Sequence, residues 1–526
     1  MSRNSSSSMS ERETEKLPCN IEVISQTSKN LSGSIKQISG SKDKDVVYDF
    51  IVNFDPDLYA GEKVDEKEIT KKLDKTFLLP LLITYLFQFL DKVALNYAKV
   101  MGLAVDLKLV GNQFSDLPTY FFVAYIIAEF FQGFYIIQKF PVAKVLAVNV
   151  FLWGIFITLS ACATNFAGIM VLRVLLGVTE SCITPCLILL TTSFYSKKEG
   201  TFRMGIWYSG LGFGQIVGGI ISFLFQLIEN TTIPGWKIMF IFIGALNIFC
   251  AIYLYMFIPS TPLDHKGLSE LEKYTLLVKL SAGKIGVTSK KLIWSQIVEL
   301  FCDIQAYLLL IISATISFSS NTISTFSSID IMSFGFSAKE AALLNMPSGV
   351  VSIISSFLST FFIMKGVPRY LAITVLIIPA VIGAALMSFL PKSNQAGLLV
   401  GIYMINTITA PLAICYSWAG VNFAGSTKKI GSTAVFISIG FALGNIVGPQ
   451  SYRVKDAPDY YPAKISMLIT QAVSIPLAWL IALIYYLRNK RRNAKQALET
   501  VEIEDDMLNA WSNLTDFQNK SFRYSY

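Results

Sequence analysis

Windows of about twenty mostly apolar residues recur along the chain after residue 75, and this feature constrains the fold most strongly. Each window can cross a hydrocarbon layer about 30 Å thick, because a helix rises ~1.5 Å per residue. Twelve windows lie near 76–98, 117–137, 142–163, 166–195, 204–228, 236–258, 304–325, 338–364, 369–390, 397–423, 431–450 and 464–487. The sequence therefore predicts an all-α membrane protein with twelve transmembrane helices.

The composition argues against a soluble protein. Only 15% of the 526 residues are charged, 53% are hydrophobic, and the mean hydropathy is +0.52. A soluble chain of this length would form about two to four domains with polar surfaces, which need more charged residues. The net charge of +8 is spread between the apolar windows and not gathered in a patch with aromatic residues, so nucleic-acid binding is not expected.

Few residues of this chain could support enzymatic chemistry. The seven cysteines lie mostly in apolar windows and imply no disulfide framework. The single histidine, His265, has no cluster of cysteines or histidines around it, so we expect no metal site. No hydrolytic set of side chains and no ATP-binding loop is recognisable. We therefore expect neither an enzyme nor an ATP-driven pump, and no cofactor.

Loop charges predict the topology. Segment 259–303 divides the windows into six-helix halves at 76–258 and 304–487. Basic residues occur on alternate loops, at Lys139, Lys144, Lys197, Lys198, Arg203, Lys365, Arg369, Lys428 and Lys429. The excess of lysine and arginine places these loops in the cytoplasm, together with segment 259–303, the serine-rich disordered tail 1–75 and the tail 488–526. Asn230 begins an N-x-T sequence on the opposite face, where it could be glycosylated.

The two halves are related in sequence by an offset of 230 residues. The offset converts Gly210, Gly214 and Gly218 of the fifth window into Gly440, Gly444 and Gly448 of the eleventh. It also relates Lys198 to Lys428, and Asp91 to Asn321. Glycines spaced by four residues allow another helix to approach closely. A parallel repeat of six spans, with a substrate path between the halves, is typical of secondary transporters.

Amide side chains occupy matched positions next to these glycines. Gln215 follows Gly214, and Asn445 follows Gly444. In a membrane such amides can bind a substrate or form hydrogen bonds between helices, and the sequence does not separate the two roles.

Ionisable residues inside the windows are the main candidates for function, because they are costly to bury in lipid. Asp91 and Lys92 are adjacent in the first span, or mark its end. Arg173 and Glu180 of the fourth span are two helical turns apart, about 10 Å along one face, and Gly177 lies between them. They offer a cation for a substrate carboxylate and an acid that protonation can neutralise, or else a structural pair.

Glu129 of the second span is a further acid inside the membrane. It can serve proton coupling or have a structural role. Protonation of such an acid is the simplest energy coupling that the residues allow, so protons are the expected coupling ion.

Several of these stretches resemble one transporter family. The stretch LDKVALNYA, from Leu90 to Ala98, resembles the first-span motif of the fungal allantoate permease group. This group belongs to the anion:cation symporter family of the major facilitator superfamily. RVLLGVTESCITP (173–185) resembles its fourth span, while WAGVNFAGSTKK (418–429) and GNIVGPQSYRVKDAPDYYP (444–462) resemble its tenth and eleventh spans. The last match is the most specific, and the resemblance covers about residues 75–490.

The resemblance implies proton-coupled uptake of a small carboxylate, such as allantoate, ureidosuccinate, a vitamin carboxylate or a sulfur-containing amino acid. It implies proton binding at Asp91 and Glu180 and anion binding at Lys92 and Arg173. Asn422, in the tenth-span stretch, is a further candidate for substrate binding. Lys92 replaces the arginine that related hexonate and sialic-acid symporters carry, and a lysine cannot clamp a carboxylate with two parallel hydrogen bonds.

The sequence thus predicts a monomeric major-facilitator transporter that imports an organic anion with protons by alternating access. A carrier without proton coupling and a transporter-like nutrient sensor are the alternatives. The predicted location is the plasma membrane, with the vacuolar or endoplasmic reticulum membrane as alternatives.

Overall fold

The computed structural model describes residues 65–228, 233–282, 293–496, 514–519 and 522–526, with residues 50, 54 and 59. Every regular element in these ranges is helical. Twelve helical segments of the described residues, some made of consecutive helices joined by one or two turn residues, are long and apolar enough to cross a membrane. The predicted all-α architecture with twelve spans is therefore confirmed. Asn230, the predicted glycosylation site, lies outside the described residues.

The helices have the following bounds. The first half contains α3 (Glu66–Val100), α5 (Gln113–Phe131), α7 (Val142–Ser160), α8 (Phe166–Glu180), α9 (Ile183–Phe194), α10 (Lys197–Tyr208), α11 (Gly210–Gln226) and α12 (Gly235–Phe257). The second half contains α15 (Ile304–Ser333), α16 (Ala338–Leu344), α17 (Met346–Met364), α18 (Arg369–Phe389), α19 (Gln395–Ile405), α20 (Pro411–Asn422), α21 (Ser426–Ile430), the π-helix η6 (Gly431–Ile437), α22 (Ser438–Gln450) and α23 (Tyr461–Gln496). The first membrane-spanning helix of the described residues, α3, begins at Glu66, before the first predicted window.

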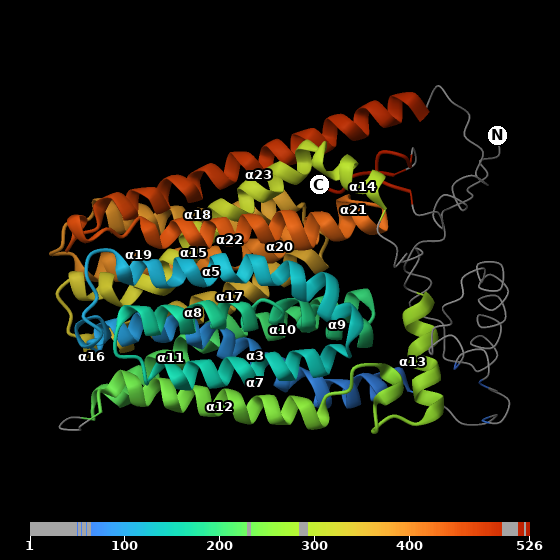
Figure 1. Ribbon diagram of the computed structural model, residues 1–526. Coiled ribbons are helices and arrows are strands. Elements are labelled where there is room, and N and C mark those ends of the chain that lie inside the picture. Colours follow the sequence, from blue (N-terminus) through green and yellow to red (C-terminus); the bar gives the residue numbers. More distant parts are fainter. Residues whose placement is uncertain are drawn as a thin grey trace.

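The spans lie side by side with their axes roughly along one direction, and the two halves form adjacent bundles (Figure 1). α7 and α12 lie on one side of the molecule, and α18 and α23 on the other. The halves meet where α5 packs on α22, α11 on α17 and α3 on α15. Two apolar cores follow this division, one mainly within each half.

Glycines permit the closest helix contacts inside each half. A Cβ atom on Gly210 would lie 2.9 Å from the backbone nitrogen of Leu86, and one on Gly214 would lie 2.7 Å from its carbonyl oxygen. Both contacts join α11 to α3. Gly218 faces only side chains of α3. The related glycines of α22 approach α15 even more closely: Cβ atoms on Gly440, Gly444 and Gly448 would overlap the carbonyl oxygens of Leu310, Ala314 and Phe318.

The segment between the halves, predicted as a loop, contains the helices α13 (Glu270–Ala282) and α14 (Trp294–Phe301). α13 packs on the start of α3, where Lys72 pairs with Glu272 at 2.7 Å and Lys279 with Glu66 at 2.8 Å. Burial is the largest single effect on the pKa of the Glu272 carboxyl and would raise it, but the hydrogen bonds from Lys72 and Ser269 and the charge of Lys72 together outweigh burial and lower the pKa. Charge pairing thus fixes α13 to the first half.

The C-terminal residues lie against the second half. The Ser525 backbone nitrogen donates to the Asn422 side-chain oxygen at 2.7 Å, and the Asn422 amide donates back to the Ser525 carbonyl at 2.8 Å. The Tyr524 ring stacks on Tyr485 with centroids 5.1 Å apart. Asp516 pairs with Lys428 at 2.7 Å, and neither side chain is exposed. We call this end of the bundle, with α13 and α14, the inner end, since the sequence predicts it to be cytoplasmic, and the opposite end the outer end.

Candidate functional site

The four charged residues predicted in the first and fourth spans come together, and they pair between the two helices. Asp91 and Lys92 lie on α3, whereas Arg173 and Glu180 lie on α8. Arg173 Nη1 is 3.5 Å from Asp91 Oδ1, and Lys92 Nζ is 3.1 Å from Glu180 Oε1. Each helix therefore supplies one acid and one base, and the four formal charges cancel.

Helix geometry explains this crossed pairing. Consecutive residues on an α-helix point about 100° apart, so Asp91 and Lys92 cannot share a partner at one position. Arg173 and Glu180 occur on one face of α8, about 10 Å apart along its axis. Gly177 lies between them and has a different role: a Cβ atom there would overlap the carbonyl oxygen of Phe121 on α5. The missing side chain lets α8 pack closely against α5.

The two pairs differ in their surroundings. Lys92 Nζ lies 5.5 Å from the ring centroid of Phe122 on α5 and 6.0 Å from that of Phe441 on α22. Phe441 belongs to the second half, so the Lys92–Glu180 pair faces the junction between the halves. The Arg173 guanidinium instead lies 5.7 Å from the ring centroid of Phe240 on α12. The Asp91–Arg173 pair is therefore enclosed within the first half.

Lys92 also differs from the other charged side chains of the cluster in its exposure to solvent. The Lys92 side chain is 19% exposed, whereas that of Glu180 is fully buried and that of Arg173 is 4% exposed. Nε and Nη2 of Arg173 have no hydrogen-bond partner among the described residues. Lys92 is thus the charged group of this cluster that a solute between the halves would reach first.

Glu129 forms a separate polar link between the halves. Ser438 Oγ on α22 donates to Glu129 Oε1 on α5 at 3.0 Å. The hydroxyl of Tyr416, on α20, lies 3.4 Å from the same Ser438 oxygen. Glu129 is two helical turns from Phe122, about 10 Å along α5, and so stands apart from the Lys92–Glu180 pair.

The three predicted amide residues have different environments. Gln215 is buried, and its side-chain oxygen has no hydrogen-bond partner among the described residues. It lies beside Gly349 of α17 at the junction of the halves. Asn445 donates to the carbonyl of Phe441 in its own helix at 2.6 Å. Its side-chain nitrogen therefore contributes to helix structure.

Asn422, which the sequence predicts to bind the substrate, contacts the C-terminal residues in this structure. Its amide oxygen and nitrogen both bond to the backbone of Ser525, and the side chain is buried. Asn422 thus holds the C-terminal residues at the inner end, and its role in substrate binding stays a prediction.

Gln88 and Asp330 are among the buried polar residues that were not predicted from the sequence. Gln88, one turn before Lys92 on α3, accepts a hydrogen bond from Thr184 at 3.5 Å. Asp330 on α15 accepts one from Tyr452 at 2.6 Å and is completely buried. Asp330 lies beyond the predicted end of the seventh window, and recognition that the helix continues to Ser333 would have revealed it. Within the described ranges, no group of three or more histidine, cysteine or acidic residues could hold a metal ion.

Comparisons with known proteins decide the family. The model of the Major Facilitator Superfamily matches residues 81–449. The chain belongs to this superfamily. It is 33% identical over 494 residues to the thiamine pathway transporter THI73 of Saccharomyces cerevisiae, covering 94% of this chain and 92% of the relative. It is 30% identical over 499 residues to the allantoate permease of the same yeast, covering 89% and 91%. The predicted resemblance to the fungal allantoate permease group is confirmed.

Solved structures show the same fold. A D-xylose-proton symporter matches with a TM-score of 0.58 at 12% identity, covering 77% of this chain and 96% of the symporter. A bacterial homologue of the human lysosomal transporter Spinster matches with a TM-score of 0.56 at 17% identity, covering 80% and 98%. The family and the twelve spans together make this chain an integral membrane transporter of small molecules.

Proposed function

We propose that this major-facilitator protein imports a small organic anion together with protons by alternating access, as a monomer in the plasma membrane. The observation that carries the proposal is the crossed pair of ion pairs between α3 and α8, in which Lys92–Glu180 faces the second half. The Lys92 ammonium is the anion-binding group, and the Glu180 carboxylate is the proton-binding group.

Charge balance supports proton coupling. The four side chains carry no net charge, and an additional charge buried at this depth would cost several kcal/mol. A carboxylate that binds Lys92 must displace Glu180, which is then left as an unpaired buried acid. Protonation of Glu180 removes this charge and keeps the cluster neutral. Entry of one negative charge is therefore coupled to entry of one proton.

The two bases have different roles in this proposal. The sequence favoured Arg173 as the group that holds the substrate carboxylate. Its position against Phe240 and its low exposure favour a positioning role, in which the pair with Asp91 fixes α8 relative to α3. Lys92 makes a point-charge contact, so it tolerates carboxylates of varied geometry more readily than an arginine fork would.

The relatives support a substrate class. The name of the allantoate permease, which shares 30% identity with this chain, specifies a carboxylate. The name of the thiamine pathway transporter refers to a vitamin pathway, which keeps vitamin-related carboxylates among the candidates. Phe122 and Phe441 beside Lys92 offer apolar contacts to the remainder of a compact substrate.

The test uses purified protein in liposomes and labelled allantoate, nicotinate, pantothenate and biotin. We expect accumulation of at least one anion only when a proton gradient is imposed. Glu180→Gln should retain exchange of labelled for unlabelled anion but lose gradient-driven accumulation. Glu270→Gln changes an exposed carboxylate on α13 and should behave as the unaltered protein. Accumulation that persists after the gradient is collapsed, or that survives Glu180→Gln, would contradict the proposal and favour a different coupling. Uptake that only equilibrates the anion, with or without the gradient, would contradict it as well and favour a facilitative carrier.

A further inference from the structure

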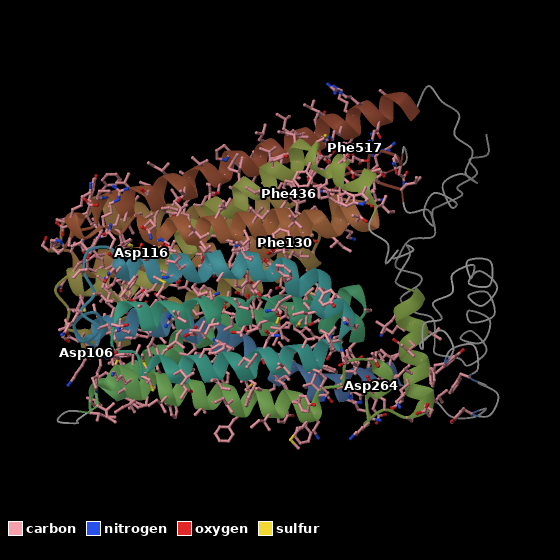
Figure 2. All side chains as sticks on the ribbon, in the orientation of Figure 1. Asp106, Asp116, Phe130, Asp264, Phe436 and Phe517 are labelled. Atoms are coloured by element: carbon pink, nitrogen blue, oxygen red, sulfur yellow. The ribbon has the colours of Figure 1, made fainter. Side chains whose placement is uncertain are left out.

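Hydrogen bonds between the two halves gather at the outer end, around the residues that follow α22. Gln450 Nε2 donates to Asp116 Oδ1 at 3.0 Å and to Thr119 Oγ1 at 2.8 Å on α5. Ser115 Oγ donates to the Tyr452 carbonyl at 3.1 Å. Asp116 lies at this end of the molecule, opposite Asp264 and Phe517 (Figure 2). These contacts close the outer junction between α5 and the second half.

A second set of contacts lies behind the first. The side-chain amide of Asn96 on α3 is 3.1 Å from the hydroxyl oxygen of Ser327 and 3.0 Å from that of Ser328 on α15. The Asn345 amide donates to Ser327 at 2.9 Å and to the Tyr97 hydroxyl of α3 at 3.2 Å. Ser327 is completely buried in this junction. Any opening of the outer side must break this layer and expose Ser327.

Tyr452 occupies the centre of the outer contacts. Its ring stacks on Phe326 of α15, with centroids 4.1 Å apart and planes at 13°, and packs on Tyr460 at 4.8 Å. Its hydroxyl donates to Asp330 Oδ2 at 2.6 Å. Lys464 Nζ, at the start of α23, lies 3.9 Å from the other Asp330 oxygen. These ring contacts and the hydroxyl hydrogen bond of Tyr452 thus join it to its own half, while its carbonyl bonds to the first half.

We propose that residues 450–460 form the external gate of the transporter and that the Tyr452–Asp330 hydrogen bond is the lock that positions it. This inference rests on the alternating-access function proposed above. The buried lock fixes the backbone at Tyr452 so that its carbonyl meets the Ser115 hydroxyl. Opening breaks the bonds to α5 and leaves the lock intact, so the gate can close again in the same geometry.

The position of the gate also explains a stretch that the ion-pair cluster leaves without a role. GNIVGPQSYRVKDAPDYYP was the most specific of the family-like stretches, and none of its residues contacts the Asp91–Arg173 or Lys92–Glu180 pair through a hydrogen bond or ion pair described here. Its polar and aromatic members instead make the gate contacts.

The test measures access to a cysteine behind the gate in the purified full-length protein, without any substrate. Ser327→Cys supplies the target, and a charged thiol reagent is added. Labelling is followed over time by mass spectrometry of fragment ions that assign the modification to residue 327 and separate it from the exposed native Cys302. Tyr452→Phe removes only the hydroxyl of the lock. Tyr461→Phe makes the same change on an exposed neighbouring side chain and is the matched control.

We expect Tyr452→Phe to raise the labelling rate roughly tenfold or more, the effect of losing one hydrogen bond to a charged group, and Tyr461→Phe to leave it unchanged. A second target distinguishes gating from general loosening. Thr360→Cys lies in the contact between α17 and Gly205 of α10, nearer the inner end. Its labelling should stay constant or fall when Tyr452 is changed.

An unchanged labelling rate at residue 327 in Tyr452→Phe would overturn the proposal, as would an equal rise at residue 360. If Tyr452→Phe does not fold, Ser115→Ala removes the partner of the Tyr452 carbonyl from the first half and should also raise labelling at residue 327. An unchanged rate there would be equally damaging. Because no substrate is present, these results do not depend on whether the transported compound is an anion or is coupled to protons.

Discussion

Replacing Arg173 with methionine would remove one charge of the enclosed ion pair and keep a side chain of similar length. Asp91 would then be an unpaired buried carboxylate between α3 and α8. Two unit charges 3.5 Å apart attract by about 5 kcal/mol at an effective dielectric constant of about 20. Breaking a buried pair typically costs about 3–5 kcal/mol. We therefore expect Arg173→Met to lower the stability of the protein by about this amount.

The assay heats purified protein and measures the fraction that remains folded and monodisperse. Asp91→Asn combined with Arg173→Met removes both charges, and replacing a buried ion pair by neutral residues is often nearly neutral for stability. The double variant should therefore recover most of the lost stability. Lys92→Met should also destabilise the protein, because it leaves the fully buried Glu180 without its partner.

Two outcomes would refute this reasoning. If Arg173→Met unfolds at the same temperature as the unaltered protein, the pair does not stabilise the contact between α3 and α8. If the double variant is as unstable as Arg173→Met alone, the loss comes from the packing of the guanidinium on Phe240 and not from an unpaired charge.

Two further predictions concern helix packing and the C-terminal residues. Gly444→Leu should abolish transport and lower surface abundance, because its side chain would overlap the carbonyl of Ala314. The control is Gly420→Leu, whose side chain would point into open space and should be tolerated. Equal transport by the two variants, corrected for abundance, would exclude close packing as the cause. Asp516→Asn should lower thermal stability by ~1–3 kcal/mol, since it weakens one of the ion pairs of buried Lys428. An unchanged unfolding temperature would show that the C-terminal residues are not held by this pair.

The twelve membrane spans could be predicted from the sequence because the membrane constrains each of them separately. Lipid imposes a minimum length and an apolar composition on every crossing helix, so the windows can be recognised in the sequence without any knowledge of how the helices pack. The spacing of the glycines also predicted close helix contacts, because residues four positions apart lie on one helix face. Gly214 and Gly444 accordingly lie in the contacts between α11 and α3 and between α22 and α15.

The pairing of charges was not predictable in this way. Asp91 and Lys92 are neighbours in sequence, and Arg173 and Glu180 share a helix face, so the sequence suggested one pair on each helix. The observed partners depend on how α3 and α8 are rotated about their axes and how far they are shifted along each other. That arrangement is fixed by packing, including the contact at Gly177, and not by spacing.

Contacts between distant segments were also hidden. Nothing near Asn422 in the sequence indicates that Ser525 would occupy its amide. Tyr452 and Asp330 are likewise separated by several spans, although each is a recognisable polar residue near an apolar window. Sequence patterns of this kind identify unusual residues, but only the fold shows which of them meet.

The repeat relationship finally shows that the charged cluster of the first half has no charged counterpart in the second half. Adding 230 converts Asp91, Lys92, Arg173 and Glu180 into Asn321, Thr322, Tyr403 and Ala410, so every charge of the cluster is neutral in the second half. Asn321 now bonds to the backbone of Asn445, and Tyr403 to that of Leu344. A charged cluster in both halves would have to be buried twice, at additional cost in lipid. In our proposal the first half therefore binds the anion and the proton, and the second half supplies Phe441 and the external gate.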